Sequence, residues 1–439
     1  MARPGRGFVL TSAVLALAAG LAAAATQGLV FAAVTVVAAV YVAVLTTFGL
    51  RNTGIVAMVL AFGFAPMYRG AEGLTGGTVP PTDVFILLGI LHLLPTFLGN
   101  RLKLPPVYVI GLLLTAVLSL VSVIVTGDLF NNAFYAGQWL FFIGALPIVI
   151  AWWRPHRTIV VWLLWAYLAG HLISTAKAIT EGAVFANRYD GFTHHPNAFG
   201  LGGVTSIAIV LFLLHHHKDL RVRVLLLGVV AISLLSVSLS GSRAAIVVLA
   251  ALVVLIPIVE RSALMGVGLA VVGALGVLSI PFVIDASGEE TALGRLAGGG
   301  TASGSDKIRE AALEDGFARL WQSPILGSGF KDVEQYHNVY LEAAVAIGIL
   351  GLACYLVVMF ALARPLFTHH PLRRLTYIVW VFIGIAPTFP GLWDRTVWVP
   401  ASLAALAMLT PETQNAPADP EVEPTRSQPV VPGVSPGRA

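Results

Sequence analysis

Runs of about 20 apolar residues recur along most of this chain, and they restrict its fold more than any other feature. A helix of that length crosses the hydrocarbon core of a bilayer, which is about 30 Å thick. Every backbone N–H and C=O inside a bilayer must be paired, so each run is expected to form a helix. Hydrophobic residues make up 57% of the chain and charged residues 11%, as is typical of proteins that lie in lipid. The sequence therefore predicts an all-α fold, a polytopic integral membrane helix bundle of about 12–14 transmembrane helices.

About 14 segments qualify as spans by length and apolar content. They are roughly residues 8–25, 29–48, 54–68, 83–99, 105–126, 132–151, 158–176, 196–214, 222–239, 244–259, 263–283, 338–363, 375–390 and 393–409. The first run follows Arg3 and Arg6, as a signal peptide would. A second run begins almost at once, so we expect the first run to be retained as a span.

The positions of Lys and Arg indicate how the bundle is oriented. With the N-terminus in the cytoplasm, about 16 of the 26 Lys and Arg fall on the cytoplasmic side, in agreement with the positive-inside rule. Both termini are then cytoplasmic in a multi-pass protein of the cell inner (cytoplasmic) membrane, and the long loop of about 284–337 is extracytoplasmic. Residues 411–439 are rich in Pro, Glu and Gln, and we expect them to form a disordered cytoplasmic tail.

Charge and cysteine content argue against two other classes of protein. The formal net charge of +4 is small for 439 residues, so the sequence predicts no nucleic acid partner. The single cysteine, Cys354, lies in an apolar run, which rules out a disulfide or a thiol metal site within one chain.

The long extracytoplasmic loop divides into two parts. Residues 286–305 are rich in Gly, Ser, Ala and Thr and are expected to be mobile. Residues 306–322 predict an amphipathic helix with Asp306 as its N-cap, lying on the membrane surface or over the spans. Pro324, Gly327 and Gly329 then predict a turn toward the next span.

The first of three polar groups at the extracytoplasmic ends of predicted spans is NRYDGFTHHPNAFG, residues 187–200. It places Arg188, His195 and Asn197 around the start of a helix. An ordinary polar loop is one interpretation, and the density of ionisable groups favours a binding role. No metal site is expected, because adjacent histidines such as His194 and His195 rarely converge on one ion at a helix start.

The second group is SLSGSRAA, residues 238–245, in which Ser242 and Arg243 open an apolar helix. A helix N-terminus exposes unpaired N–H groups and carries partial positive charge. Serine hydroxyls and a guanidinium group at that position can receive a phosphate or a carboxylate. The alternative is that Arg243 only reaches to the membrane interface, but an arginine at the mouth of a buried helix is costly and favours function.

The third group, HNVYLE at residues 337–342, stands where the long loop meets the next span. His337 can exchange a proton near neutral pH, because the unperturbed pKa of histidine is about 6.5. Asn338 is expected to be the N-cap, and Tyr340 and Glu342 follow in the first turn. The alternative is that His337 is only an interfacial aromatic residue.

The order of these pieces resembles the O-antigen ligase and Wzy-type polymerase family of bacterial membrane proteins. The resemblance rests on HNVYLEAAVAIGILGL after a long loop, on PILGSGF before it, and on SGSRAA and RYDGFTHHPNAFG upstream. It covers about residues 187–363, the expected catalytic core. Residues 1–186 and 364–410 are expected to be N-terminal and C-terminal groups of transmembrane helices.

The resemblance implies a glycosyltransferase that uses no metal or other cofactor. Its donor would be a glycan on a polyprenyl pyrophosphate, and its acceptor a lipid or another glycan, at the outer face of the membrane. The resemblance implies that Arg243 and Arg188, supported by Ser242, contact the pyrophosphate and that His337 is the catalytic base. Supporting roles are expected for five residues: Asn338, His195, Asn197, Glu342 and Tyr340.

Three other functions are compatible with the sequence. A polymerase of the same family would use the same residues. A transporter or flippase of an anionic solute or a lipid-linked glycan would have the same all-helical profile, although its charges are expected at the bilayer midplane rather than at helix ends on one face. A purely structural membrane partner would leave the His and Arg of that face unexplained.

Overall fold

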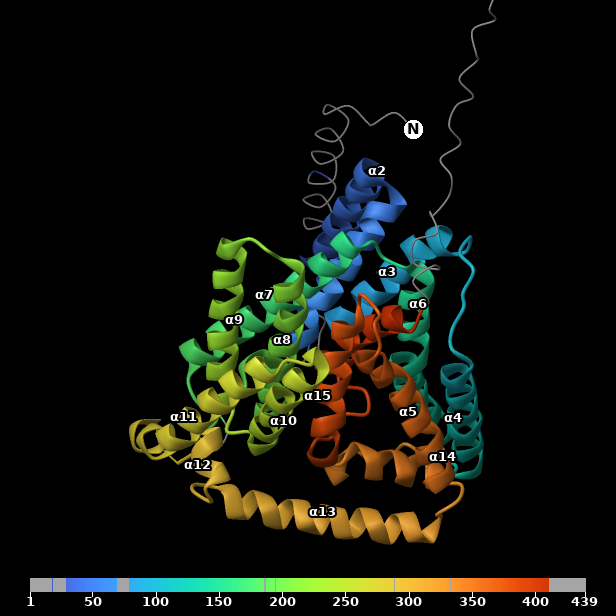
Figure 1. Ribbon diagram of the computed structural model, residues 1–439. Coiled ribbons are helices and arrows are strands. Elements are labelled where there is room, and N and C mark those ends of the chain that lie inside the picture. Colours follow the sequence, from blue (N-terminus) through green and yellow to red (C-terminus); the bar gives the residue numbers. More distant parts are fainter. Residues whose placement is uncertain are drawn as a thin grey trace, which may run out of the picture.

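The structure of the chain is a computed structural model that describes residues 18, 29–68, 79–184, 187–193, 195–287, 289–331 and 333–409 (Figure 1). The expected first span and the expected tail at 411–439 lie outside these residues, apart from Ala18. The helices form a bundle, and one long helix, α13, lies across one end of it. This end is called the α13 end below.

All regular elements of the described residues are helices. The longer ones are α2 (Leu29–Phe64), α3 (Pro81–Phe97), α4 (Pro106–Val125), α5 (Leu129–Leu140), α6 (Leu146–Trp153), α7 (Arg157–Glu181), α8 (Pro196–His216), α9 (Leu220–Leu239), α10 (Arg243–Glu260), α11 (Ala263–Ser287), α12 (Ala292–Leu296), α13 (Ala302–Gln322), α14 (Val339–Ala363), α15 (Tyr377–Ile385) and α16 (Arg395–Ala401). Short helices, mostly 3-10, are η1 (Ala65–Met67), η3 (Phe141–Ala145), η4 (Gly191–Thr193), η5 (Val333–Tyr336), η6 (Arg364–Phe367), η7 (Arg373–Thr376), η8 (Ala386–Thr388) and η9 (Ser402–Met408).

Eight helical segments of the described residues are long and apolar enough to cross a membrane, which agrees with the expected polytopic all-α bundle. They are Val40–Met67, Pro106–Val125, Leu129–Trp153, Arg157–Glu181, Pro196–His216, Leu220–Leu239, Arg243–Glu260 and Val339–Phe367. The segments expected at 375–390 and 393–409 instead form short helices, α15 and α16, each followed by a 3-10 turn. Pro387 and Pro390 lie between them, and neither has the backbone N–H that a continuous helix would need at these positions.

Helix α8 is the most enclosed of these eight segments: 83% of an apolar stretch of 18 residues within it is buried inside the bundle. Its glycines allow neighbouring helices to come close. A Cβ atom on Gly200 would stand 2.6 Å from Ser240 Oγ, and one on Gly203 would stand 2.6 Å from Ser236 Oγ. Small residues at helix contacts are the usual way in which membrane helices approach each other. This contact brings the end of α9 to the start of α8.

Helix α14 bends at Gly348, whose φ of +75° is left-handed. The turn at 324–329 inserts at this bend: Ser328 N donates to Val345 O at 2.7 Å, and Ile349 N donates to Pro324 O at 2.8 Å. A Cβ on Gly348 would overlap the carbonyl oxygen of Ile325. The predicted turn is therefore present, and its backbone supplies hydrogen bonds that the bent helix cannot make within itself.

Two expectations about the long loop need correction. Residues 286–305 were expected to be mobile, but they contain α12 and the start of α13. Arg295 of α12 is buried among hydrogen-bond acceptors, and these contacts fix this part of the loop. Helix α13 begins at Ala302 with Thr301 at the N-cap position, so Asp306 lies inside the helix rather than at its cap. The carboxylate of Asp306 instead pairs with Arg243.

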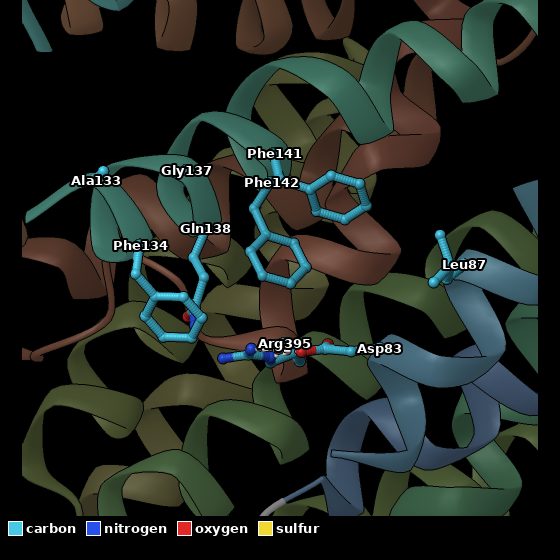
Figure 2. Close-up of a pocket in the computed structure, with 9 residues that line it drawn as sticks. All are labelled: Asp83, Leu87, Ala133, Phe134, Gly137, Gln138, Phe141, Phe142 and Arg395. Atoms are coloured by element: carbon cyan, nitrogen blue, oxygen red, sulfur yellow. Dashed lines mark hydrogen bonds and ion pairs between the residues drawn. The ribbon is translucent and has the colours of Figure 1, made fainter. Parts of the chain in front are cut away.

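A pocket of about 410 Å³ opens between α3, α5 and the start of α16 (Figure 2). Arg395 and Asp83 form an ion pair at one side of it, and aromatic side chains of α5 and η3 cover the other.

Candidate functional site

Arg188 joins the first and second polar groups predicted from the sequence. Its side chain is buried, with 5% of the residue exposed. Nε donates to the carbonyl oxygen of Ser240 at 2.7 Å, and Nη2 donates to Oδ1 of Asn197 at 2.8 Å. The loop before α8 is thus fixed to the turn that links α9 to α10.

That turn depends on Gly241, which has a φ of +61°. A Cβ there would lie 2.6 Å from the carbonyl oxygen of Glu290 and 2.8 Å from Nε of Arg188. Glycine is therefore required for both its backbone conformation and its closeness to two other segments.

Helix α10 begins at this turn with Ser242 as its N-cap, and Oγ of Ser242 accepts from Ala245 N at 3.3 Å. Arg243 is the first helical residue. Its Nη1 donates to Oδ2 of Asp306 at 2.9 Å, and Nη2 pairs with the other carboxylate oxygen. At the opposite end of α10, about 26 Å away at 1.5 Å per residue, Glu260 pairs with Arg373 and Arg374. Arg243 and the pair of Arg373 and Arg374 therefore contact opposite ends of one helix.

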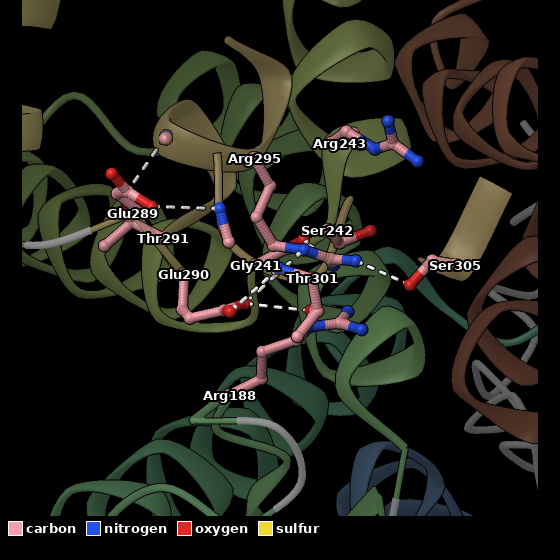
Figure 3. Close-up of polar contacts among 12 residues, drawn as sticks. Arg188, Gly241, Ser242, Arg243, Glu289, Glu290, Thr291, Arg295, Thr301 and Ser305 are labelled. Atoms are coloured by element: carbon pink, nitrogen blue, oxygen red, sulfur yellow. Dashed lines mark hydrogen bonds and ion pairs between the residues drawn. The ribbon is translucent and has the colours of Figure 1, made fainter. Parts of the chain in front are cut away.

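Arg295 of α12 is part of the site, although the sequence analysis did not single it out (Figure 3). Only 2% of this residue is exposed. Its Nη1 donates to Gly241 O at 2.8 Å, Nη2 donates to Ser305 Oγ at 2.8 Å, and Nε lies 3.7 Å from a carboxylate oxygen of Glu290. A signal was present in the sequence, because the predicted orientation places Arg295 in the extracytoplasmic loop, on the face that the positive-inside rule depletes.

Arg309 of α13 is the fourth arginine of this group and was also missed. Burial lowers its pKa, and the positive charge of Arg243 lowers it further. Burial also lowers the pKa of Arg188, and the charges of Arg295 and Arg309 add to this effect. Six charged residues take part in these electrostatic interactions and are called the arginine cluster: Arg188, Arg243, Arg295, Arg309, Glu290 and Asp306.

The arginine cluster has an excess of positive charge. Four guanidinium groups face two carboxylates, Glu290 and Asp306. The N-terminus of α10 adds partial positive charge and free N–H groups. An anion with two or more negative charges would relieve the repulsion among the arginines, so this arrangement suits a phosphate or a pyrophosphate.

His337 lies half-buried ahead of α14, with a φ of +51° that is uncommon for a residue other than glycine. Burial lowers its pKa below the usual 6.5, and the positive charge of Arg309 lowers it further. Nδ1 is buried and has no hydrogen-bond partner among the described residues. The imidazole is therefore neutral near pH 7, and Arg309 lies close enough to influence both His337 and the arginine cluster.

The residues after His337 hold the start of α14. Oδ1 of Asn338 accepts from Tyr340 N and Leu341 N, each at 3.1 Å, so the predicted N-cap is present. The hydroxyl of Tyr340 donates to Ile383 O at 3.1 Å, which ties α14 to α15. Glu342 is fully buried in the first turn of α14. The contacts of Asn338 and Tyr340 position the loop that carries His337.

His195 is the N-cap of α8, because its Nδ1 accepts from Asn197 N at 3.2 Å. Its ring also makes an edge contact with Phe389, at 6.4 Å between centroids. His194 lies outside the described residues. In the part of the chain that is described, no three His, Cys, Asp or Glu side chains come together as metal ligands would.

Comparison with known proteins gives one match. Residues 228–356 match the family model described as O-antigen ligase, which confirms the resemblance to that family over this segment. The segment runs from within α9 to within α14 and includes Arg243, Arg295, Arg309 and His337. Searches of curated proteins and of solved structures found no match.

Proposed function

We propose that this chain, whose residues 228–356 match the O-antigen ligase family, transfers a glycan from a polyprenyl pyrophosphate to a hydroxyl of a lipid or glycan acceptor. The reaction takes place at the α13 end, which faces away from the cytoplasm in the cytoplasmic membrane. Both termini are cytoplasmic in this proposal, and the process served is assembly of cell-envelope polysaccharide.

The arginine cluster receives the pyrophosphate of the donor. A pyrophosphate is the leaving group of the reaction, and it gains negative charge as the glycosidic bond breaks. Guanidinium groups fixed in advance stabilise that charge without needing to reorganise. Arg188 and Arg295 are buried and held by several hydrogen bonds, whereas Arg243 is partly exposed and can turn from Asp306 to the substrate. Because arginines supply the positive charge, the proposed reaction needs no metal ion.

His337 takes the proton of the acceptor hydroxyl as the oxygen attacks the anomeric carbon. A neutral imidazole can accept a proton, and burial together with Arg309 keeps His337 neutral. General base catalysis by histidine contributes roughly 10²–10⁴ in rate. Attack from the side opposite to the pyrophosphate inverts the anomeric centre.

One observation carries the proposal. Four arginines from four separate segments converge at the N-terminus of α10, and one of them, Arg309, also acts on a neutral histidine. A transporter of anions would use the cluster but has no need of a neutral base beside it. This arrangement of arginines and a neutral histidine therefore favours group transfer over transport.

The test measures release of polyprenyl pyrophosphate from a polyprenyl-pyrophosphate-linked oligosaccharide by purified protein in detergent, with and without acceptor. Release by the wild type is expected to require acceptor and to fall by roughly 10²–10⁴ in His337→Ala. His369→Ala is the matched control, since His369 is exposed and lies after α14. Binding of the donor without release in all three proteins would contradict group transfer and favour transport.

The length of the product distinguishes two enzymes of this kind. A ligase adds one glycan to each acceptor, and a polymerase extends the product by repeated additions. Gel or mass analysis of the product with limiting acceptor separates these outcomes.

A further inference from the structure

An apolar groove of about 290 Å³ lies between α10 and α15, outside the arginine cluster. Four residues of α10 between Val248 and Leu255 line it, together with four residues of α15 between Trp380 and Gly384. All eight are apolar or glycine, apart from the indole N–H of Trp380, which already donates to Ala363 O at 3.1 Å. Two of the lining residues, Ala251 and Gly384, are small and exposed, so the groove opens to lipid between the two helices.

The groove is closed at the end that faces α13. A Cβ on Gly384 would stand 3.2 Å from Cγ1 of Val248, so the two helices touch there. Toward the other end Leu255 and Trp380 are both partly exposed. The distance along α10 from Val248 to its last residue, Glu260, is about 18 Å at 1.5 Å per residue. This length is close to half of a hydrocarbon core of about 30 Å, so the groove has the reach of one acyl chain of one leaflet.

Basic side chains gather at the open end of the groove, around the carboxylate of Glu260. Nε of Arg374 donates to Oε1 of Glu260 at 2.9 Å, and Nη2 of Arg373 donates to Oε2 at 3.2 Å. The charges of these three residues and of Arg157 all act on the side chain of His215. These five residues, which come from α7, α8, α10 and η7, are called the Glu260 cluster.

The Glu260 cluster has an excess of positive charge. Three guanidinium groups, those of Arg157, Arg373 and Arg374, face one carboxylate. Each guanidinium group has five N–H donors, and the contacts with Glu260 use only some of them. The side chains of Arg373 and Arg374 are 20% and 16% exposed, so a phosphate group at the surface can reach them. Asp219 does not balance this charge, because it accepts from Arg221 N as the N-cap of α9.

The Glu260 cluster lies at the level of lipid headgroups, and the groove lies at the level of acyl chains. Three of the apolar spans, Arg157–Glu181, Pro196–His216 and Arg243–Glu260, begin or end in the cluster. Phe367 and Trp380 make an edge contact of 5.6 Å beside it, as aromatic residues do at a membrane interface. The groove instead faces the inner part of the span Arg243–Glu260.

We propose that an anionic phospholipid binds at this end of the bundle, with its phosphate at the Glu260 cluster and one acyl chain in the groove. In the orientation proposed above, it belongs to the inner leaflet of the cytoplasmic membrane, where basic sites between helices attract anionic headgroups. A zwitterionic lipid binds less well, because its cationic group is repelled by the arginines. The carrier chain of a donor held at the arginine cluster is disfavoured in this groove, because the contact of Val248 with Gly384 closes the end nearest to that cluster.

The first test is native mass spectrometry of the full chain in detergent, with dioleoyl phosphatidylglycerol and dioleoyl phosphatidylcholine at equal concentrations. Adducts of phosphatidylglycerol are expected to exceed those of phosphatidylcholine several-fold. Inorganic phosphate in large excess should not remove them, because the acyl chain contributes to binding. Equal adducts of the two lipids, or complete displacement by phosphate, would overturn the proposal.

Two pairs of variants separate the two parts of the site. Ala251→Leu fills the groove, and Ala250→Leu is its matched control, because Ala250 is exposed on the same helix and does not line the groove. Arg373→Gln removes one charge of the Glu260 cluster, and Arg221→Gln removes an exposed charge outside it. Ala251→Leu and Arg373→Gln should each lose most of the preference for phosphatidylglycerol, and the controls should keep it. Full preference in Ala251→Leu and in Arg373→Gln would be the contrary result.

A second test needs no variant and no catalysis, so its outcome is independent of the proposed glycan transfer. Phosphatidylglycerol with a diazirine at the middle of one acyl chain is added to the wild type in phosphatidylcholine nanodiscs. Labelled peptides are expected from α10 and α15, several-fold more than with the matching phosphatidylcholine probe. Unlabelled phosphatidylglycerol should compete for the label better than a polyprenyl phosphate. Better competition by the polyprenyl phosphate would assign the groove to a carrier chain and overturn the proposal.

Discussion

Arg188 and Ser240 are joined by a hydrogen bond of 2.7 Å from the guanidinium Nε to the backbone carbonyl oxygen. The bond links two segments separated by 52 residues and by two full helices, α8 and α9. Because Arg188 is buried, it acts both as a structural link and as a positive charge at the start of α10. The two polar groups predicted separately from the sequence are thus parts of one site.

Arg188→Lys is expected to weaken this link while keeping the charge. A lysine cannot match the fork that holds Ser240 O and Asn197 Oδ1, so one buried acceptor loses its partner at a cost of about 1–3 kcal/mol. The thermal unfolding midpoint, followed by tryptophan fluorescence in detergent, should fall. Arg223→Lys is the control, because the side chain of Arg223 also donates to a carbonyl oxygen but is exposed. Equal midpoints in both variants would contradict a structural role for Arg188.

The pH profile should report the effect of the positive charge of Arg309 on His337. The proposed base, His337, must be neutral to accept a proton, and its pKa is lowered, so kcat should stay high to a lower pH than for an ordinary histidine. Arg309→Gln removes a positive charge and raises the pKa of His337, which moves the acid limb of the kcat profile to higher pH. Arg243→Gln weakens donor binding but should leave the acid limb in place, because Arg243 is not among the groups that shift this pKa. An acid limb that moves equally in both variants would refute the specific role of Arg309.

Asp306→Asn should tighten donor binding. Asp306 occupies both Nη atoms of Arg243 in the structure, and its side chain is 54% exposed, so in the proposed reaction it would compete with an incoming pyrophosphate. Removal of the carboxylate frees Arg243 and adds one net positive charge to the cluster. The donor KM is expected to fall several-fold at low salt, and less at high salt because exposed charges are screened. Asp315→Asn, an exposed change on the same helix outside the cluster, should have little effect.

Gly241→Ala should destabilise the arginine cluster. A non-glycine residue in the left-handed region costs roughly 1–2 kcal/mol, and the added methyl group also meets Glu290 O and Arg188. Gly228→Ala, in the middle of α9 with open space around it, should instead gain up to about 1 kcal/mol. Thermal unfolding of the two variants tests the contrast. A midpoint for Gly241→Ala as high as that of the wild type would be the contrary result.

The parts of the site that could be predicted from the sequence are those fixed by local rules. Asn338 and Ser242 were expected at helix starts, and both are N-caps because a short polar side chain before an apolar run satisfies free N–H groups. Arg243 was singled out because a charged residue at the start of an apolar helix is costly. These inferences needed no knowledge of distant residues.

The remainder of the site depends on contacts across long stretches of chain. Arg295 lies in a Gly-rich segment, and its hydrogen bond to the carbonyl oxygen of Gly241, 54 residues away, could not be predicted from local sequence. Arg309 was counted with the polar face of an amphipathic helix, because periodicity does not show which bundle element that face meets. Asp306 looked like a cap by its position, but its contact with Arg243 outweighs that local preference.

The join between α14 and the turn at 324–329 is made by backbone groups, and this has a consequence for sequence divergence. Ser328 N, Ile349 N and their carbonyl partners would be present whatever side chains stood there, except at a proline N. Gly327, Gly329 and Gly348 are constrained, because all three have a left-handed φ, and a Cβ on Gly327 or Gly348 would overlap a carbonyl oxygen of the other segment. Most other residues of this stretch can therefore change without loss of the join, so in a related sequence these three glycines are a better guide to the join than the motif around them.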